Sequence, residues 1–273
     1  MVSWVGWRWA VRLVDVVLPP CCLWCHCGLP HRVERKFCSA CWAELAQETP
    51  SKCLWCDAAL VQNPSSARCA SCQSWPRWLG PVVSLGPYQG ALRRAVLRGK
   101  TVHGEALVAG LGEALGQEVQ RRGLPPAELV VPVPLHWKRR LLRQTNPAST
   151  LALHVAQVLR VPCRRLIRRR RATQSQGGLS AWARWHNVHR AFAPWSKMDL
   201  GGKTVLLVDD ILTTGATASQ AAGVLRHLGA AQVLVAVLAR ATSPAARKAS
   251  APASPAPLPH PQSSQEVLNG VHK

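Results

Sequence analysis

The chain has 273 residues, enough for one large domain or two small ones with a hydrophobic core. Hydrophobic residues make up 48% of the chain, which excludes a protein that is disordered throughout. Lysine and arginine number 34 against 13 acidic residues, and the formal net charge of +21 is unevenly distributed. Residues 1–81 carry +3, residues 82–242 carry +16 and residues 243–273 carry +2. The middle segment therefore has the greatest capacity to bind anions.

The first 20 residues contain charged side chains that interrupt every apolar run, namely Arg8, Arg12 and Asp15. A secretory signal needs an unbroken apolar stretch, and a membrane span needs about 18 apolar residues. The three charges share one face of a helix, so residues 1–20 are predicted to form an amphipathic helix. This helix would pack on the rest of the protein or on a membrane surface. We expect a cytoplasmic protein with reduced thiols and no membrane span.

Eight of the 11 cysteines form four Cys-x-x-Cys pairs, and the last two pairs repeat the first two at an offset of 31 residues. Two such turns can direct four thiolates at one tetrahedral zinc ion. We therefore predict two structural Zn²⁺ sites. The simplest partition follows chain order, with interleaved pairing as the alternative. The ligands in chain order are Cys22, Cys25, Cys38 and Cys41, which we name the first cysteine cluster, and Cys53, Cys56, Cys69 and Cys72, the second cysteine cluster.

Protein ligands fill all four positions of each predicted site, so neither site keeps an open position for a catalytic water. Eight of the 12 tryptophans also lie in residues 1–81, where a short segment needs large apolar side chains to form a core. Residues 21–81 are therefore predicted to form a double zinc ribbon with a structural role.

The pattern changes at residue 82 to alternating strands and helices, which predicts an α/β domain with a parallel sheet over residues 82–242. The expected strands cover residues 82–88, 129–135, 203–209 and 232–239, and the expected helices cover residues 90–98, 104–121, 149–160 and 217–228. Residues 243–273 contain six prolines and no hydrophobic periodicity, so they are predicted to form a disordered tail.

One strand leads directly into residues suited to a phosphosugar. The apolar residues 205–208 precede two adjacent acids, Asp209 and Asp210, and a turn. We name this turn, made of Thr213, Thr214, Gly215, Ala216 and Thr217, the threonine-rich turn. Backbone N–H groups and hydroxyls at such a helix start can surround a phosphate, and the acids can accept hydrogen bonds from ribose hydroxyls. The alternative is an ordinary strand that ends in a capped helix.

This strand and turn resemble the signature of type I phosphoribosyltransferases. Together with the zinc module, they make the chain resemble the ComF family of competence-related proteins over residues 10–241. Other similar positions are Val131, Pro132, Val133, Pro134, Leu135 and His136, residues 168–173, and Gln176, Leu179, Arg184, Asn187, Ala191 and Phe192. The resemblance implies an N-terminal double zinc ribbon followed by a parallel-sheet α/β domain of the phosphoribosyltransferase type.

The resemblance also implies roles for individual residues. Asp209 and Asp210 would bind the ribose hydroxyls of phosphoribosyl pyrophosphate, and the threonine-rich turn would bind the 5′-phosphate. Mg²⁺ would bridge pyrophosphate and ribose oxygens. Arg143, with Arg139 and Arg140 as further candidates, would stabilise the charge on departing pyrophosphate. The implied activity is a Mg²⁺-dependent pentosyl transfer to an acceptor that the sequence does not specify.

One segment departs from the family pattern. The family usually continues with Arg-Gly-Phe-Asn-Gln, where this chain has Arg143, Gln144, Thr145, Asn146 and Pro147. Gln144 would be strained if the position needs a positive φ, and Pro147 removes a backbone donor. If the segment shapes the active site, this departure bears on whether the chain catalyses transfer.

A second hypothesis is a non-enzymatic role in DNA uptake. The same fold would bind single-stranded DNA or assemble with the competence machinery, and would keep the phosphate site as a sensor. Residues 168–171 form the longest basic run, which predicts a lid over pyrophosphate, a track for nucleic-acid phosphates or a solvated turn. Trp182 and Trp185 would suit stacking on bases or a hydrophobic helix face.

Overall fold

The computed structural model describes residues 20–30, 36–47, 51–60, 68–76, 78–135, 146–170, 191–195 and 198–241. Several sequence predictions lie outside these residues: the N-terminal helix over residues 1–20 apart from its last residue, and the tail over residues 243–273. The individual residues outside are His136, Arg139, Arg140, Arg143, Gln144, Thr145, residues 171–173, Gln176, Leu179, Trp182, Arg184, Trp185 and Asn187. No helix in the described ranges is long and apolar enough to cross a membrane.

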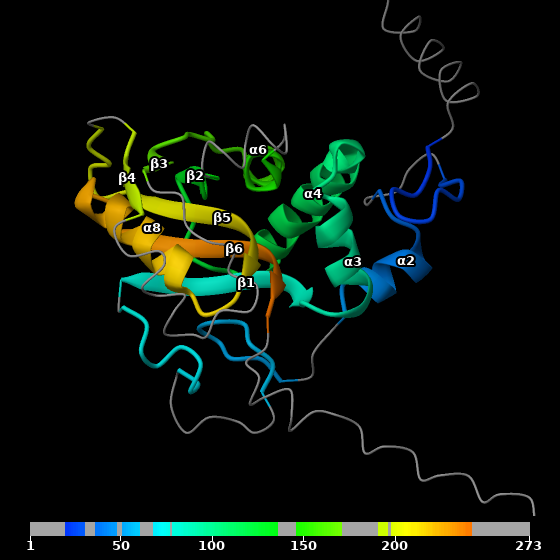
Figure 1. Cartoon of the computed structure of the whole chain (residues 1–273), viewed down its shortest axis with the longest axis horizontal. Coiled ribbons are helices and arrows are strands. Elements are labelled where there is room, and N and C mark those ends of the chain that lie inside the picture. Colours follow the sequence, from blue (N-terminus) through cyan, green and yellow to red (C-terminus); the bar gives the residue numbers. More distant parts are fainter. Residues whose placement is uncertain are drawn as a thin grey trace, which may run out of the picture.

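A four-stranded parallel sheet forms the centre of the described chain, in the order β1-β6-β5-β2 (Figure 1). The strands are β1 (Leu79–Pro87), β2 (Leu129–Pro132), β5 (Thr204–Leu212) and β6 (Gln232–Arg240). Of the two inner strands, β6 is buried along almost its whole length, and β5 is apolar and buried from Val205 to Val208, as expected for a parallel sheet covered on both faces. The predicted α/β fold class is confirmed.

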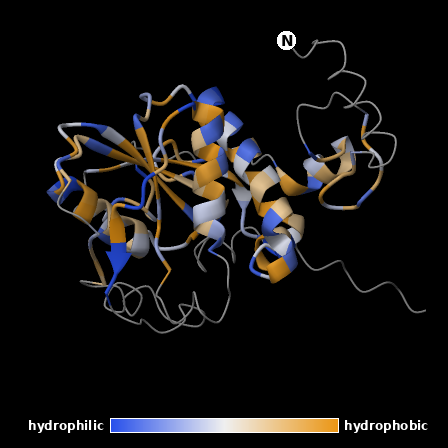
Figure 2. Cartoon of the chain, turned by 90° about the horizontal axis from the view of Figure 1, so that it is seen from above, coloured by the Kyte–Doolittle hydropathy of each residue, from blue (hydrophilic) through white to orange (hydrophobic). Residues whose placement is uncertain are grey.

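Helices cover both faces of this sheet: α3 (Gly90–Arg98), α4 (Glu105–Arg121) and α6 (Pro147–Leu159) on one face, and α8 (Ala216–His227) on the other. The short helix α2 (Ser39–Leu45) packs on α3, and the 3-10 helix η1 (Val102–Gly104) leads into α4. Alternate residues of β5 point to opposite faces: Val205 and Leu207 pack with α8, while Leu206 and Val208 pack with α3, α4 and α6. In Figure 2 the strands are mostly orange, whereas the helices carry both blue and orange faces.

Three boundaries differ from the sequence predictions for identifiable reasons. β5 continues past Asp209 because its pairing with β6 extends to Leu212, so the acid pair lies on the strand itself. β2 ends at Pro132, where Pro132 and Pro134 cannot donate to a ladder. Pro147 occupies the first turn of α6, where an N–H would have no partner within the helix, and proline is well tolerated there.

A two-stranded antiparallel sheet was not predicted from the sequence. It pairs β3 (Ile167–Arg169) with β4 (Phe192–Pro194), and Arg168 lies opposite Ala193. The basic run therefore begins as a strand rather than as a turn. Each strand has only three residues, which is too short for hydrophobic alternation to be recognised.

The segments around the two cysteine clusters attach to different parts of the domain, as Figure 1 shows. The first packs against α3 and α4 through Phe37 and Leu45, and Lys36 Nζ lies 2.7 Å from Glu113 Oε1 on α4. The segment around the second cysteine cluster covers β1, which is one of the two edge strands of the four-stranded sheet. Trp55 Nε1 donates to Leu79 O at 3.1 Å.

Two further hydrogen bonds complete the cover of the β1 edge. Val82 N donates to Trp55 O at 2.9 Å, and Ser84 N donates to Asp57 Oδ2 at 3.0 Å. The buried Asp57 also lies 2.6 Å from Arg122 Nη2 at the end of α4. The second cysteine cluster thus belongs to a segment that satisfies an otherwise open sheet edge.

Two helical glycines provide a matched test of this packing. A Cβ on Gly112 of α4 would lie 2.9 Å from His154 Cβ and 3.1 Å from Leu151 O of α6, whereas a Cβ on Gly223 of α8 would meet nothing within 4 Å. Both changes to alanine favour the helix by roughly 0.5–1 kcal/mol. We expect Gly223→Ala to raise the free energy of unfolding by about that amount, and Gly112→Ala to lower it because α4 and α6 must separate. Denaturant unfolding measures both; equal stabilisation by the two variants would contradict this packing.

Candidate functional site

The structure gathers the eight predicted zinc ligands into two groups, following chain order rather than interleaved pairing. In each group, the four ligand sulfurs lie within 4.8 Å of one another. The second cysteine cluster is buried throughout, whereas Cys25 of the first is exposed. Four sulfurs at this separation surround a space suited to one tetrahedral ion.

The environment of the sulfurs fits a metal. Cys22 Sγ accepts N–H bonds from Trp24 at 3.5 Å and from Cys38 at 3.4 Å. Burial opposes ionisation of Cys22, but the backbone hydrogen bonds outweigh it and lower the pKa to about 6. The same balance lowers the pKa of Cys53 to about 7. In the absence of a cation, burial and the neighbouring sulfurs raise the pKa of three other ligands, namely Cys41, Cys56 and Cys72. The placement of four sulfurs around one space is therefore what makes each cluster able to hold a zinc ion.

The acid pair lies at the carboxyl edge of the sheet. Asp210 N donates to Asp209 Oδ1 at 2.9 Å, and Lys100 Nζ lies 2.8 Å from Asp210 Oδ2. Removal of water from Asp209 raises its pKa well above the usual range, and repulsion from Asp210 adds to this, while Lys100 acts in the opposite direction. Val133, which follows β2, reaches the same edge because its N–H donates to Val208 O at 2.8 Å.

The threonine-rich turn follows β5 and begins α8. Gly215 has a φ of +80°, which an L side chain rarely adopts, and this bend lets the chain enter the helix directly. Donors behind the turn hold its carbonyl groups. Trp75 Nε1 donates to Thr214 O at 2.9 Å, and Arg240 Nη1 donates to Leu212 O at 3.1 Å and also to Thr213 O.

These contacts fix the direction of the N–H groups of the turn. A trans peptide holds each carbonyl and the following N–H on opposite sides. Since the carbonyls of Leu212, Thr213 and Thr214 point toward Arg240 and Trp75, the N–H groups one residue further on point away from them. Within the described part of the chain, the N–H groups of residues 213–215 have no hydrogen-bond acceptor. Successive N–H groups exposed at a helix start form a concave site for an anion.

Three residues at this site were missed by the sequence analysis: Lys100, Trp75 and Arg240. Lys100 follows α3, more than 100 residues before the acids, and no motif connects the two segments. Trp75 was predicted only as part of a zinc-ribbon core. Arg240 gave the clearest available signal, because it is a charged residue at the end of a continuously apolar strand.

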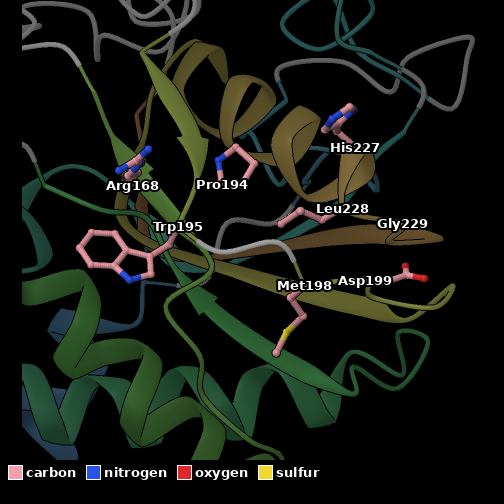
Figure 3. A pocket seen from close by; sticks show the side chains of 8 residues that line it. All are labelled: Arg168, Pro194, Trp195, Met198, Asp199, His227, Leu228 and Gly229. Atoms are coloured by element: carbon pink, nitrogen blue, oxygen red, sulfur yellow. The ribbon is translucent and has the colours of Figure 1, made fainter.

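A cavity of about 640 Å³ lies at the other end of α8 (Figure 3). It is lined by Arg168, Pro194, Trp195, Met198, Asp199, His227, Leu228 and Gly229. Because α8 has 12 residues, this cavity lies about 18 Å from the threonine-rich turn. The cavity is therefore separate from the acid pair and the turn.

A parallel sheet with an acid pair and a threonine-rich helix start at its carboxyl edge defines a domain of the phosphoribosyltransferase type. The phosphoribosyl transferase domain family matches residues 146–253. Among solved structures, the chain resembles glutamine phosphoribosylpyrophosphate amidotransferase from B. subtilis complexed with ADP and GMP. The two are 22% identical over 49% of this chain and 26% of that one, with a TM-score of 0.35.

Two relatives identify the family more narrowly. The chain is 37% identical over 116 residues to competence protein F of Haemophilus influenzae, covering 42% of this chain and 51% of that protein. It is 33% identical over 180 residues to the DNA utilization protein YhgH of Salmonella typhi, covering 64% of this chain and 78% of that protein. The match thus spans about half the length of competence protein F. The chain belongs to the ComF family, as the resemblance in its sequence predicted.

The raised pKa of Asp209 has a consequence for stability. Its raised pKa means that the folded chain retains a proton that the unfolded chain releases, so the free energy of unfolding falls as pH rises from the usual aspartate pKa to the raised value. Asp209→Asn removes this contribution and keeps the acceptor oxygen. We expect the variant to melt at a higher temperature than the unaltered chain at pH 8, and to depend less on pH. Thermal unfolding between pH 4 and pH 8 measures this; an equal or lower melting temperature at pH 8 would contradict it.

Proposed function

We propose that this chain binds phosphoribosyl pyrophosphate at the carboxyl edge of its sheet, with Mg²⁺, and transfers the phosphoribosyl group to a nucleophilic acceptor. Asp209 and Asp210 bind the ribose hydroxyls, and the threonine-rich turn binds the 5′-phosphate. The observation that carries this proposal is the set of N–H groups in residues 213–215. They face away from Arg240 and Trp75, directly after the acid pair.

The charges at this edge suit the proposed reaction. Transfer breaks the bond from the anomeric carbon to pyrophosphate and forms a bond to the acceptor, so positive charge develops on the sugar and negative charge on the leaving group. Lys100 places an ammonium group beside Asp210. Arg143 remains a candidate for the same task by resemblance. Mg²⁺ prefers oxygen ligands, and when bound it would neutralise pyrophosphate oxygens.

We also propose that both cysteine clusters bind zinc in a structural role. Four cysteines per group would fill all four coordination positions of a zinc ion, which leaves none for a reacting water. The ions would therefore stabilise the N-terminal segments. The domain limits predicted from the sequence, residues 21–81 for the ribbon and 82–242 for the transferase-type domain, remain a prediction, and β1 begins at Leu79, inside the first of these ranges.

A thermal-shift experiment tests the ligand. At a concentration of phosphoribosyl pyrophosphate about 100 times its dissociation constant, with Mg²⁺, stabilisation of about 2.7 kcal/mol corresponds to a rise in melting temperature of roughly 5–10 °C. Asp210→Ala should abolish the rise, because it removes a ribose ligand.

Asp199→Ala is the matched control, since Asp199 is an acid that lines the cavity at the other end of α8. It should retain the full rise. No rise in the unaltered chain would refute the proposed ligand, and loss of the rise in Asp199→Ala alone would move the ligand to that cavity.

A second candidate function is binding of single-stranded DNA. A specific observation favours it: Arg164, Arg165, Arg168 and Arg170 are all exposed, and Trp195, 66% exposed, directly follows the adjoining strand β4. Trp195 N donates to Leu166 O, and Trp195 and Arg168 line the same cavity (Figure 3). Guanidinium groups beside an exposed indole suit phosphates and stacked bases. The names of the relatives, a competence protein and a DNA utilization protein, are consistent with this function.

Salt dependence tests this candidate. If Arg168 and Arg170 each contact a phosphate, replacing both with alanine should make the slope of log affinity against log salt shallower by about 1.4. Replacing Arg93 and Arg94, two exposed arginines on α3, removes the same charge from another surface and should leave the slope unchanged. Fluorescence anisotropy with a labelled oligonucleotide measures both; equal slopes in the two double variants would contradict the assignment to β3.

A further inference from the structure

The second cysteine cluster and the threonine-rich turn share one buried cation. Arg240, 4% exposed, closes β6 and lies between them. On one side, its Nε donates to Cys56 O at 3.0 Å, and its Nη2 lies 4.0 Å from Cys56 Sγ. On the other side, its Nη1 donates to Leu212 O and Thr213 O. A single guanidinium therefore contacts both a predicted zinc ligand and the base of the turn.

Trp75 forms a second connection. It lies three residues after Cys72, and Trp75 N donates to Cys72 O at 3.0 Å. Its indole donates to Thr214 O, and the ring packs so closely on Gly215 that a Cβ there would lie 2.5 Å from Trp75 Cε2. The Arg240 guanidinium carbon also lies 5.7 Å from the centre of this ring. The side chains of Arg240 and Trp75, which both contact the turn, therefore also contact each other.

The positive charge of Arg240 favours binding of zinc by the second cysteine cluster. Within the described residues, Arg240 forms no ion pair with a carboxylate, and its hydrogen-bond partners are carbonyl oxygens and a sulfur. A buried cation without a counter-charge is strongly unfavourable. One Zn²⁺ with four thiolates carries a net charge of −2, and the second cysteine cluster would place that charge beside the guanidinium.

We propose that Arg240 and Trp75 are positioning residues through which the zinc-loaded second cysteine cluster orients the threonine-rich turn for phosphate binding. The inference rests on the proposed function and adds a dependence of the phosphate site on one of the two zinc ions. With three carbonyls held from behind, the N–H groups of residues 213–215 converge on the ligand. When zinc leaves, Arg240 loses its counter-charge and the peptide planes of the turn are free to rotate.

Two tryptophans of the same segment allow a matched test in the full chain. Trp75→Phe removes the indole donor to Thr214 O, and Trp55→Phe removes the indole donor to Leu79 O on β1. Phenylalanine at position 75 keeps an aromatic ring beside Arg240, and phenylalanine at position 55 keeps one beside Arg68. We expect Trp75→Phe to weaken binding of phosphoribosyl pyrophosphate with Mg²⁺ by about fivefold in titration calorimetry. Trp55→Phe should bind as the unaltered chain does, and both variants should retain two zinc ions per chain.

Hydrogen exchange of the ligand-free chain gives a readout that does not need the ligand. The backbone amides of Ala216, Ser219 and Ala241, which donate to Thr214 Oγ1, Gly215 O and Leu212 O, should exchange faster in Trp75→Phe than in Trp55→Phe. Arg240→Lys supplies a second variant: it keeps the charge beside Cys56, so zinc should be retained, but one ammonium cannot reach all the carbonyls that the guanidinium fork contacts. Binding should weaken and exchange should accelerate in this variant too.

The outcomes separate the two proposals. An unaltered chain that binds no phosphoribosyl pyrophosphate refutes the proposed function, and the exchange data then decide by themselves whether the cluster orients the turn. Equal affinity and equal exchange in Trp75→Phe and Trp55→Phe overturn the positioning role. Equal weakening in both variants also overturns it, because a general loss of stability would then explain the effect.

Discussion

The buried guanidinium of Arg240 imposes the constraint on which the candidate site depends. A charge removed from water needs partners for its donors. Nε and Nη1 of Arg240 donate to the carbonyl groups of Cys56, Leu212, Thr213 and Ala241, and Nη2 lies 4.0 Å from Cys56 Sγ. Those carbonyls belong to three segments: the second cysteine cluster, the end of β5 and the end of β6. Because all of them contact one side chain, Arg240 holds the second cysteine cluster beside the threonine-rich turn.

The same arrangement explains why the two cysteine clusters are not equivalent, although their sequences repeat. The first packs against α3 and α4 on one face of the sheet, and Cys25 is exposed there. The second is buried, covers the free edge of β1 and joins the core on the α8 face. The two similar segments thus have two different attachments, and in the described residues it is the second that contacts the turn following Asp209 and Asp210. Loss of metal from the second cluster would open the sheet edge as well as loosen the turn.

Much of this fold is predictable from the sequence because its signals are local. The apolar runs of β5 and β6, the Cys-x-x-Cys spacing and the change from Asp210 to the threonine-rich turn each lie within a few neighbouring residues. The residues that were missed act over long separations. Trp75 and Thr214 are 139 positions apart, and Arg240 and Cys56 are 184 apart. Neither contact has a periodic pattern, and both arise only when the parallel sheet places the ends of β5 and β6 beside the ribbon. The pair of β3 and β4 was missed for a different reason, since three-residue strands carry too few residues to show alternation.

We propose that the carboxyl edge of the sheet, and not the cavity at the other end of α8, receives a phosphosugar on N–H groups whose direction Trp75 and Arg240 fix. A crystal structure of the full chain with zinc, Mg²⁺ and phosphoribosyl pyrophosphate would show where the phosphosugar binds. It should place the 5′-phosphate within hydrogen-bond distance of the N–H groups of residues 213–215, with Trp75 still donating to Thr214 O. A phosphate seated instead beside Arg168 and Trp195, or a turn whose carbonyls have left Trp75 and Arg240, would contradict the account.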